Sequence, residues 1–256
     1  MLDAALVRHW LQPDWQVPGV RAWCTTRAGQ LSRPPYDGFN TASHVGDDPE
    51  SVARCRRALA DYFAWSRPPQ WLRQVHGIAV VDAAPYGAKP EDGAEPEADA
   101  VYTREPEQVC TLHTADCLPV FFAAADGSEV ALAHAGWRGL AAGVLEAALA
   151  KFGTDPHLIK VWLGPAISQP AFEVGDDVRD VFLKQSTDYS GFFQANERGR
   201  WQGDLYGLAR VRLNKWGVQH ITGGGFCTYT DPRFFSFRRQ PVTGRLLSMI
   251  WIDPAQ

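Results

Sequence analysis

The chain has 256 residues, of which 25 are Lys or Arg and 29 are Asp or Glu, so its formal net charge is −4 at pH 7. This acidic balance argues against a nucleic-acid-binding protein that works through bulk positive charge, and a hydrophobic fraction of 45% argues against a disordered or fibrous chain. The length fits one large or two small domains, and we expect a single domain over residues 1–256.

The N-terminal residues and the cysteines predict the compartment. Residues 1–10 lack the basic stretch, apolar core and cleavage site of a secretory signal, and no apolar run reaches the roughly 18 residues that a membrane span requires. The five cysteines are an odd number at irregular spacing, which is typical of a reducing compartment. We therefore expect a cytoplasmic protein that binds neither membrane nor nucleic acid. The sequence leaves the oligomeric state open, and a monomer is compatible with it.

Periodicity and turn residues predict a mixture of strands and helices. In chain order, we expect a strand at 20–25, a helix at 50–63, strands at 77–82, 109–114, 118–123 and 129–134, a helix at 139–152, a strand at 159–163, a helix at 204–216 and a strand at 246–252. Segments 29–48 and 84–98 are rich in turn residues and are predicted to be long ordered loops. Without a regular alternation of strand and helix, this pattern favours an α+β or layered α/β fold.

The most informative feature is a pair of apolar runs on either side of Asp126-Gly127. An Asp-Gly pair in this setting predicts a tight hairpin. If these two residues form the loop, Pro119 lies opposite His134, and Cys117 is the diagonal neighbour of His134 on the same face. Diagonal neighbours lie roughly 7–8 Å apart at the backbone, which lets two side chains share an ion or contact each other.

A thiolate and an imidazole together suit Zn²⁺ or copper, and a third ligand would leave a fourth position open to water or substrate. His76 is the natural third candidate. The spacing alone does not select it over the other histidines in question, which are His44, His113 and His220.

Five motifs occur together and in order along the chain. They are Gln74-Val75-His76-Gly77, Thr114-Ala115-Asp116-Cys117-Leu118-Pro119, Ala133-His134-Ala135-Gly136-Trp137-Arg138-Gly139, Gly164-Pro165-Ala166-Ile167 and Phe234-Phe235-Ser236-Phe237-Arg238-Arg239. The chain resembles the YfiH family, which has been labelled multicopper polyphenol oxidase or laccase-like and was later assigned purine nucleoside phosphorylase activity. The resemblance extends over nearly the whole chain. One departure is Phe237, where the family often has His or Tyr.

The resemblance implies a metal site of His76, Cys117 and His134 that holds Zn²⁺, with copper as an alternative. It also implies a layered α/β/β/α sandwich with mixed sheets, similar to the fold of bacterial deamidating toxins. The implied activity is phosphorolysis of adenosine, inosine and S-methyl-5′-thioadenosine, with accompanying adenosine deamination. In that chemistry Cys117 and His134 are catalytic, and Asp116 is a candidate proton carrier, with Glu173 as an alternative.

Phosphorolysis requires groups that hold phosphate, ribose and base. The chain has no phosphate-binding loop of the Gly-x-x-x-x-Gly-Lys type, so arginines would hold the phosphate. Trp137 or Phe235 would be able to stack on a purine, although aromatic residues at such positions more often belong to the core. The expected substrate-binding residues are Arg27, Asn40, Gln74, Arg138, Arg238 and Arg239.

Two other activities compete with phosphorolysis. In the first, Cys117 is the nucleophile of a cysteine hydrolase or amidase, with His134 as its base and a cell-wall precursor as substrate. This role competes with metal binding, because a thiolate that binds zinc is less available for attack. A copper-dependent polyphenol oxidase is disfavoured, since its trinuclear cluster commonly uses His-x-His pairs. The chain has seven histidines and no such pair. A non-catalytic metal-binding protein is the third class.

Overall fold

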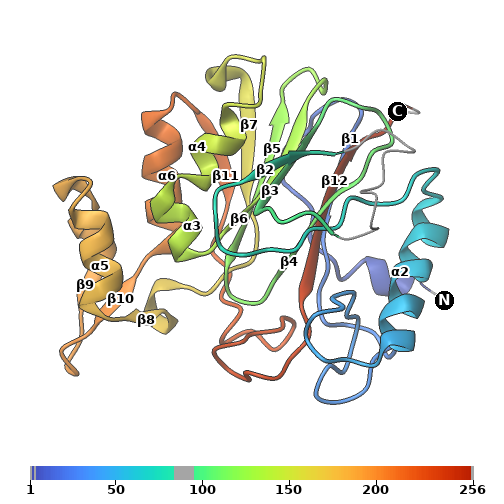
Figure 1. The fold of residues 1–256 in the computed structure, drawn as a ribbon, viewed down its shortest axis with the longest axis horizontal. Coiled ribbons are helices and arrows are strands. Elements are labelled where there is room, and N and C mark those ends of the chain that lie inside the picture. Colours follow the sequence, from blue (N-terminus) through green and yellow to red (C-terminus); the bar gives the residue numbers. More distant parts are fainter. Residues whose placement is uncertain (1, 3, 84–94, 255–256) are drawn as a thin grey trace.

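The computed structural model describes residues 2, 4–83 and 95–254 of the chain. Within these residues the chain forms three sheets with helices against them, which confirms the predicted α+β class (Figure 1). The similarity to deamidating toxins and the single-domain organisation stay predictions. Residues 84–94 of the second predicted loop lie outside the described residues. No helix in the described part of the chain has the length and hydrophobicity needed to cross a bilayer.

The largest sheet has six strands in the order β11-β7-β5-β6-β3-β2. It is mixed, because β2 runs parallel to β3 and β11 parallel to β7, while the other neighbours are antiparallel. The strands are β2 (Val80–Asp82), β3 (Ala100–Thr103), β5 (Leu118–Ala124), β6 (Val130–Ala135), β7 (Ile159–Leu163) and β11 (His220–Gly223).

The predicted hairpin forms the centre of this sheet. β5 and β6 pair in the expected register, with Pro119 opposite His134. Gly127 has a φ of +79° and lies in the tight turn, where the Asp126 carboxylate accepts hydrogen bonds from the Ser128 N–H and hydroxyl. A left-handed φ favours glycine because it has no Cβ. The Asp-Gly signal therefore identified the register correctly. The loop is longer than the two predicted residues, because the Ala124 N–H donates to the Glu129 carbonyl and the Ala125 N–H donates to the Leu158 carbonyl.

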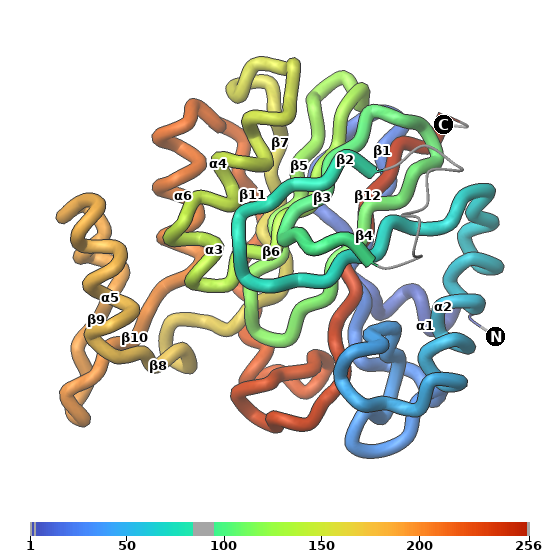
Figure 2. Tube along the Cα trace, viewed as in Figure 1, coloured from blue at the N-terminus to red at the C-terminus, as the bar shows by residue number. Residues whose placement is uncertain are grey.

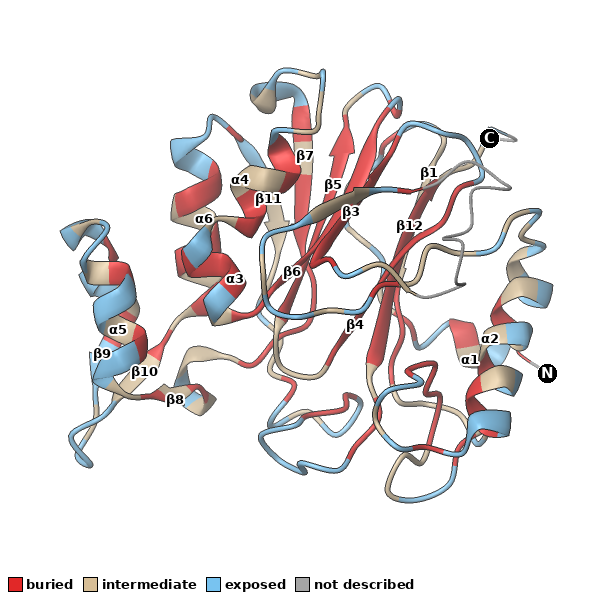
Figure 3. Cartoon of the chain, viewed as in Figure 1, coloured by how far each residue is buried: buried red, intermediate tan, exposed pale blue. Residues whose placement is uncertain are grey.

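A second sheet has the order β1-β12-β4, with β1 at Val20–Cys24, β4 at Cys110–Thr114 and β12 at Leu246–Ile252. Alternating side chains connect it to two cores. Leu246 and Ile250 of β12 pack with Phe121 of β5 in the cluster between the sheets, whereas Leu247 and Met249 pack toward α2. The period of two in a strand explains this division. Figure 3 shows that the strands of both sheets are largely buried.

Helices cover the outer faces of the six-stranded sheet and of the sheet β1-β12-β4 (Figure 1). The helix predicted at 139–152 is two helices, because Gly143 adopts a left-handed φ of +107° and interrupts it. Its apolar stripe is nevertheless buried against the six-stranded sheet. The helices are α1 (Ala4–Val7), α2 (Pro49–Phe63), α3 (Trp137–Ala142), α4 (Val144–Leu149), α5 (Asp176–Leu183) and α6 (Leu205–Lys215).

The sequence patterns missed several short elements. A small third sheet has the order β8-β10-β9, formed by Glu173–Val174, Trp201–Gly203 and Phe193–Ala195. It projects with α5 from one side of the molecule (Figure 2). Strands β3 and β11 were also missed. The predicted strand at 77–82 is shorter and begins at Val80, which leaves His76 and Gly77 in a loop.

Loops from opposite ends of the chain meet beside the sheets (Figure 2). The backbone N–H of Arg27 donates to the carbonyl of Arg233, and the N–H of Arg245 donates to Oδ1 of Asn40. The pairing of Leu246 with Thr114 then places Arg245 next to the end of β4. At the end of β4 the chain leaves the sheet β1-β12-β4 and enters the six-stranded sheet through a turn that contains Cys117.

Candidate functional site

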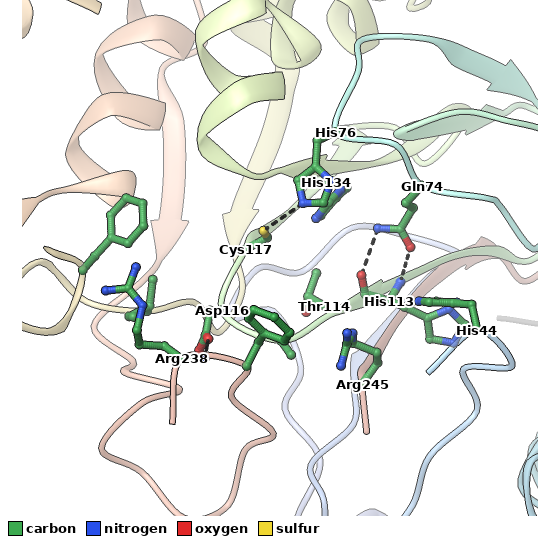
Figure 4. A pocket seen from close by; sticks show the side chains of 14 residues that line it. His44, Gln74, His76, His113, Thr114, Asp116, Cys117, His134, Arg238 and Arg245 are labelled. Carbon is green, nitrogen blue, oxygen red and sulfur yellow. Dashed lines mark hydrogen bonds between the residues drawn. The ribbon is translucent and has the colours of Figure 1, made fainter. Parts of the chain in front are cut away.

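His76, Cys117 and His134 converge from three different elements (Figure 4). His76 lies in the loop before β2, Cys117 in the turn before β5, and His134 near the end of β6. One donor atom from each residue lies within 4.8 Å of those of the other two, and Cys117 Sγ lies 3.8 Å from Nε2 of His76. The structure therefore brings together the three residues that the family resemblance implies.

Buried Asp99, directly before β3, fixes the orientation of His134. Nδ1 of His134 lies 2.8 Å from Oδ1 of Asp99, so the imidazole donates its Nδ1–H to the carboxylate and Nε2 is left for a ligand. The backbone N–H of His134 donates to the Asp99 carbonyl at 2.7 Å. Burial alone would raise the pKa of Asp99, but the hydrogen bonds from His134, Gly77 and Val75 more than offset it and lower the pKa.

The same carboxylate holds the loop that carries His76. It accepts hydrogen bonds from the backbone N–H groups of Val75, His76 and Gly77. His76 has a left-handed φ of +61°, which is uncommon for a residue other than glycine. Strained backbone of this kind persists when its surroundings over-determine it, and it concentrates at functional sites. Asp99 is thus a positioning residue for two of the three candidate ligands.

The electrostatics of the three residues favour a charged thiolate. Burial would raise the pKa of Cys117, but His134 and His76 outweigh it and lower the pKa to about 6. Burial would likewise lower the pKa of His134, but the Cys117 thiolate and Asp99 raise it to about 9. The thiolate form is the form that binds a metal or attacks an electrophile.

The donor set fits a mononuclear metal site. Four-coordinate zinc with thiolate and imidazole ligands requires donor atoms about 3.3–3.6 Å apart, and the separation of 3.8 Å between Cys117 and His76 is close to that value. A carboxylate behind a metal-binding histidine is the usual outer-shell partner. No other group of three or more His, Cys, Asp or Glu residues in the described part of the chain could hold a metal.

Gly136 leaves the space in which the three side chains meet. Its φ of −64° is accessible to any residue, but an added Cβ would lie 2.8 Å from Cδ2 of His76 and 2.9 Å from Sγ of Cys117. Gly136→Ala should therefore displace the ligands and reduce zinc affinity at least about tenfold. The unfolding free energy of the metal-free protein should fall by no more than the usual overpacking cost, about 1–3 kcal/mol.

Competition with a chelator and chemical denaturation measure the two effects of Gly136→Ala. Gly191→Ala is the matched control, since a Cβ at Gly191 would meet nothing within 4 Å. Zinc affinity equal to that of the wild type would show that the ligands do not need this space.

The three candidate ligands line a cavity of about 360 Å³. This volume is within the usual range for small-molecule sites. In Figure 4, His76, Cys117 and His134 gather at one end, and Arg245, His113 and His44 lie toward the other. The remaining lining residues are Gln74, Thr114, Ala115, Asp116, Ile167, Phe172, Phe237 and Arg238.

Asp116 lines the cavity next to Cys117, but its carboxylate also holds the surrounding loops. Oδ1 accepts a hydrogen bond from the Thr228 hydroxyl at 2.5 Å, and Oδ2 accepts one from the backbone N–H of Arg238 at 2.7 Å. Each carboxylate oxygen has a second lone pair. The position therefore allows proton transfer and also has a clear structural role. Glu173 does not line the cavity and pairs with Arg198 at 2.7 Å.

Only two of the predicted substrate-binding residues, Gln74 and Arg238, line the cavity. The Gln74 side chain exchanges two hydrogen bonds with the backbone of His113, which fixes its position. The guanidinium of Arg238 donates to the Glu173 carbonyl and lies 5.7 Å from the Phe172 ring centre.

The structure places the other four predicted residues outside the cavity lining. Arg27 pairs with Asp37, Asn40 is buried against Asp47 and the N–H of Arg245, Arg138 is exposed over the Trp137 ring, and Arg239 donates to backbone carbonyls. Neither predicted stacking residue lines the cavity, because Phe235 is fully buried and Trp137 packs against the core.

Two residues of the site, Asp99 and Arg245, were not predicted from the sequence. Asp99 follows an acidic segment, and nothing in its local pattern distinguishes it from surface carboxylates. Arg245 follows Thr243-Gly244, and only the pairing of β12 with β4 brings it to the cavity. Of the alternative third ligands, His44 and His113 line the other end of the cavity, and His220 is exposed at the start of β11.

Comparisons with known proteins agree with the motifs. Residues 21–253 match the family profile described as "Multi-copper polyphenol oxidoreductase laccase". A curated purine nucleoside phosphorylase of Pseudomonas aeruginosa is 47% identical, covering 95% of this chain and 98% of the relative. Purine nucleoside phosphorylase YfiH of Escherichia coli is 45% identical, covering 94% and 97%.

Solved structures give the same result. The crystal structure of a Neisseria meningitidis protein of family DUF152 has a TM-score of 0.89 at 40% identity and covers 96% of this chain and 99% of its own. The crystal structure of YlmD from Geobacillus stearothermophilus has a TM-score of 0.85 at 32% identity, with coverage of 99% and 98%. This extent of similarity in sequence and fold shows that the chain belongs to the YfiH family.

Proposed function

We propose that the protein is a purine nucleoside phosphorylase with a zinc site formed by His76, Cys117 and His134. The observation that carries this proposal is the convergence of these three residues in a cavity of nucleoside-binding size. Curated purine nucleoside phosphorylases that are 45–47% identical over nearly the whole chain support it. The proposed substrates are adenosine, inosine and S-methyl-5′-thioadenosine together with inorganic phosphate, and adenosine deamination accompanies phosphorolysis.

In the proposed reaction a phosphate oxygen bonds to C1′ of the ribose while the bond from C1′ to the purine nitrogen breaks. The base leaves with the electron pair and takes up one proton. The products are the free purine and ribose 1-phosphate, or 5-methylthioribose 1-phosphate where S-methyl-5′-thioadenosine is the substrate. A metal bound by the three residues would supply a Lewis acid that polarises a substrate atom or water. Copper is the alternative metal for this thiolate and imidazole set.

The protein's own residues orient the substrates. Asp99 holds His134 and the His76 loop, and Asp116 is the proposed proton carrier beside Cys117. Gln74 and Arg238 are the proposed polar contacts to the nucleoside. Ile167, Phe172 and Phe237 give the cavity its apolar surface, and Phe237 is 52% exposed, so its ring is accessible to a purine.

Three of the four remaining predicted residues act at a distance in this proposal. Asn40 holds the backbone of Arg245, and Arg239 holds the loop that carries Arg238 through its bonds to backbone carbonyls. Arg27 supports Phe235, whose ring centre lies 5.2 Å from its guanidinium carbon. A cytoplasmic location is part of the proposal, and the five free cysteines support it.

Product analysis with and without phosphate tests the activity. With phosphate, purified zinc-loaded protein should convert adenosine to adenine and ribose 1-phosphate, and inosine to hypoxanthine and ribose 1-phosphate. Without phosphate, free purine base should not form, and only deamination of adenosine to inosine should remain. Release of free base at the same rate without phosphate would mean hydrolysis and would overturn the proposal.

A cysteine hydrolase is the second candidate, and the geometry of Cys117 with His134 favours it. The lowered pKa of Cys117 and its contact with a buried, Asp-oriented histidine are features of an activated thiol nucleophile. Metal-free protein that is inert toward nucleosides, yet labelled at Cys117 by a thiol-directed reagent, would establish this candidate. A multinuclear copper oxidase lacks comparable support, because His76, Cys117 and His134 are the one candidate metal-binding group among the described residues and would hold a single ion.

A further inference from the structure

We propose that Arg245, with His44 and His113 beside it, forms the subsite for inorganic phosphate at the end of the cavity away from Cys117. This inference rests on the proposed phosphorolysis for the choice of phosphate among tetrahedral oxyanions. It differs from the sequence-based expectation, which looked for the phosphate-binding group at Arg27, Arg138, Arg238 and Arg239.

Arg245 has a half-buried guanidinium that lacks a carboxylate partner among the residues that the structure describes. Its Nη1 donates to the carbonyls of Thr243 and Gly244 at 2.9 and 3.1 Å, which fixes the plane of the guanidinium. Within the described chain, the hydrogens on Nε and Nη2 have no acceptor. A fixed guanidinium with unused donors is the arrangement that binds a phosphate through two parallel hydrogen bonds.

Two imidazoles lie beside Arg245 in the cavity. His44 and His113 line the same end of the cavity, with ring centres 5.9 Å apart. Burial lowers the pKa of both histidines, and the positive charges of Arg245 and Arg56 lower it further. Among the described lining residues the only carboxylate is Asp116, which accepts hydrogen bonds from Thr228 and Arg238. The lowered pKa values keep both imidazoles neutral, so Arg245 supplies the positive charge that an anion would meet here, and the imidazoles supply polar ring nitrogens.

A buried hydroxyl without a partner lies between the two ends of the cavity. Thr114 lines the cavity and is 1% exposed, and its Oγ1 has no hydrogen-bond partner in the described structure. Figure 4 places Thr114 between Cys117 and Arg245. A buried hydroxyl without a partner is destabilising, so a ligand oxygen that reaches it would be stabilised.

Arg238 is the competing arginine of the cavity, and its environment differs. It is exposed, lies on the other side of Asp116 in Figure 4, and already donates to the Glu173 carbonyl. Arg245 is therefore assigned to phosphate and Arg238 to the nucleoside. This assignment puts the phosphate toward Arg245 and the nucleoside toward Arg238, on opposite sides of Asp116 (Figure 4).

The test compares Arg245→Met, Arg245→Lys and Arg238→Met in the zinc-loaded protein. We expect Arg245→Met to raise the KM for phosphate at least tenfold and to change the KM for inosine less than threefold. Arg245→Lys should recover part of the loss, because it restores the charge without the two parallel donors. Arg57→Met is the control for charge, since Arg57 is exposed on α2. If the phosphate KM rises in Arg238→Met and keeps its wild-type value in Arg245→Met, the assignment is overturned.

Direct binding separates this inference from the proposed function. Inorganic phosphate is titrated into the protein in a calorimeter, without nucleoside. We expect the wild type and Arg57→Met to bind phosphate equally, and Arg245→Met to bind it at least tenfold more weakly. This result would support the subsite even if no nucleoside is cleaved. Equal phosphate affinity of wild type and Arg245→Met, with the melting temperature unchanged, would overturn it. A nucleoside-cleaving enzyme with that result would keep the proposed function and lose only the subsite.

Discussion

Replacing Cys117 by alanine should abolish phosphorolysis and reduce the bound metal from about one ion per chain to a trace. Cys117 supplies the only sulfur of the candidate site, and without it two imidazoles remain. Two neutral ligands bind zinc much more weakly than a set that contains a thiolate. Loss of the Lewis acid removes several kcal/mol of transition-state stabilisation, so kcat/KM should fall on the order of 10³-fold or more. Metal analysis and steady-state assays of the same preparation measure both effects.

Cys117→Asp separates the role of metal ligand from the role of nucleophile. A carboxylate can bind zinc but cannot replace a thiol as a nucleophile of the same kind. We expect this variant to retain some metal and some phosphorolysis, whereas a cysteine hydrolase would lose all activity. Cys227→Ala is the matched control, because Cys227 is a half-buried free thiol that does not line the cavity. Full metal content and activity in Cys117→Ala would contradict the metal site itself.

Local patterns in the sequence were enough to predict the pairing at the centre of the site. The Asp126-Gly127 turn fixes which residues of β5 and β6 face each other, and the spacing along a strand is regular, so Cys117 and His134 could be brought together without a structure. The helix pattern was less reliable. A continuous apolar stripe predicted one helix at 139–152. The left-handed Gly143 divides that helix into two, but the apolar side chains still face the same core.

The positions of His76, Asp99 and Arg245 depend on contacts between distant segments. His76 precedes a strand of three residues, Val80–Asp82, whose pairing with β3 cannot be inferred from so short a pattern. Arg245 reaches the cavity because β12 pairs with β4, more than a hundred residues earlier in the chain. The resemblance to a known family supplied His76, whereas no motif pointed to the other two residues. Long-range strand pairing thus limits what local periodicity can predict about the site.

Removing the Asp99 carboxylate should weaken both metal binding and the fold. The carboxylate is fully buried and accepts hydrogen bonds from Nδ1 of His134 and from three consecutive backbone N–H groups. In Asp99→Ala these donors lose their acceptor, and we expect the unfolding free energy of the metal-free protein to fall by about 3–5 kcal/mol. Zinc affinity should fall about 10–100-fold, because His134 and His76 lose the group that orients them. Urea denaturation and chelator competition give the two values.

Asp99→Asn distinguishes positioning of the ligands from general support of the loop. Oδ1 serves His134 and His76, and Oδ2 serves Gly77 and Val75, so an amide keeps one acceptor and turns the other into a donor. The stability loss should therefore be smaller than that of Asp99→Ala, while zinc affinity still falls at least tenfold because the amide weakens the basicity of His134. Asp82→Asn is the control, since Asp82 is an exposed carboxylate that pairs with Lys151 and should change stability by less than about 1 kcal/mol. Wild-type zinc affinity in Asp99→Asn would mean that Asp99 supports only the His76 loop and does not orient His134. The orientation of His134 would then have to come from its place in β6.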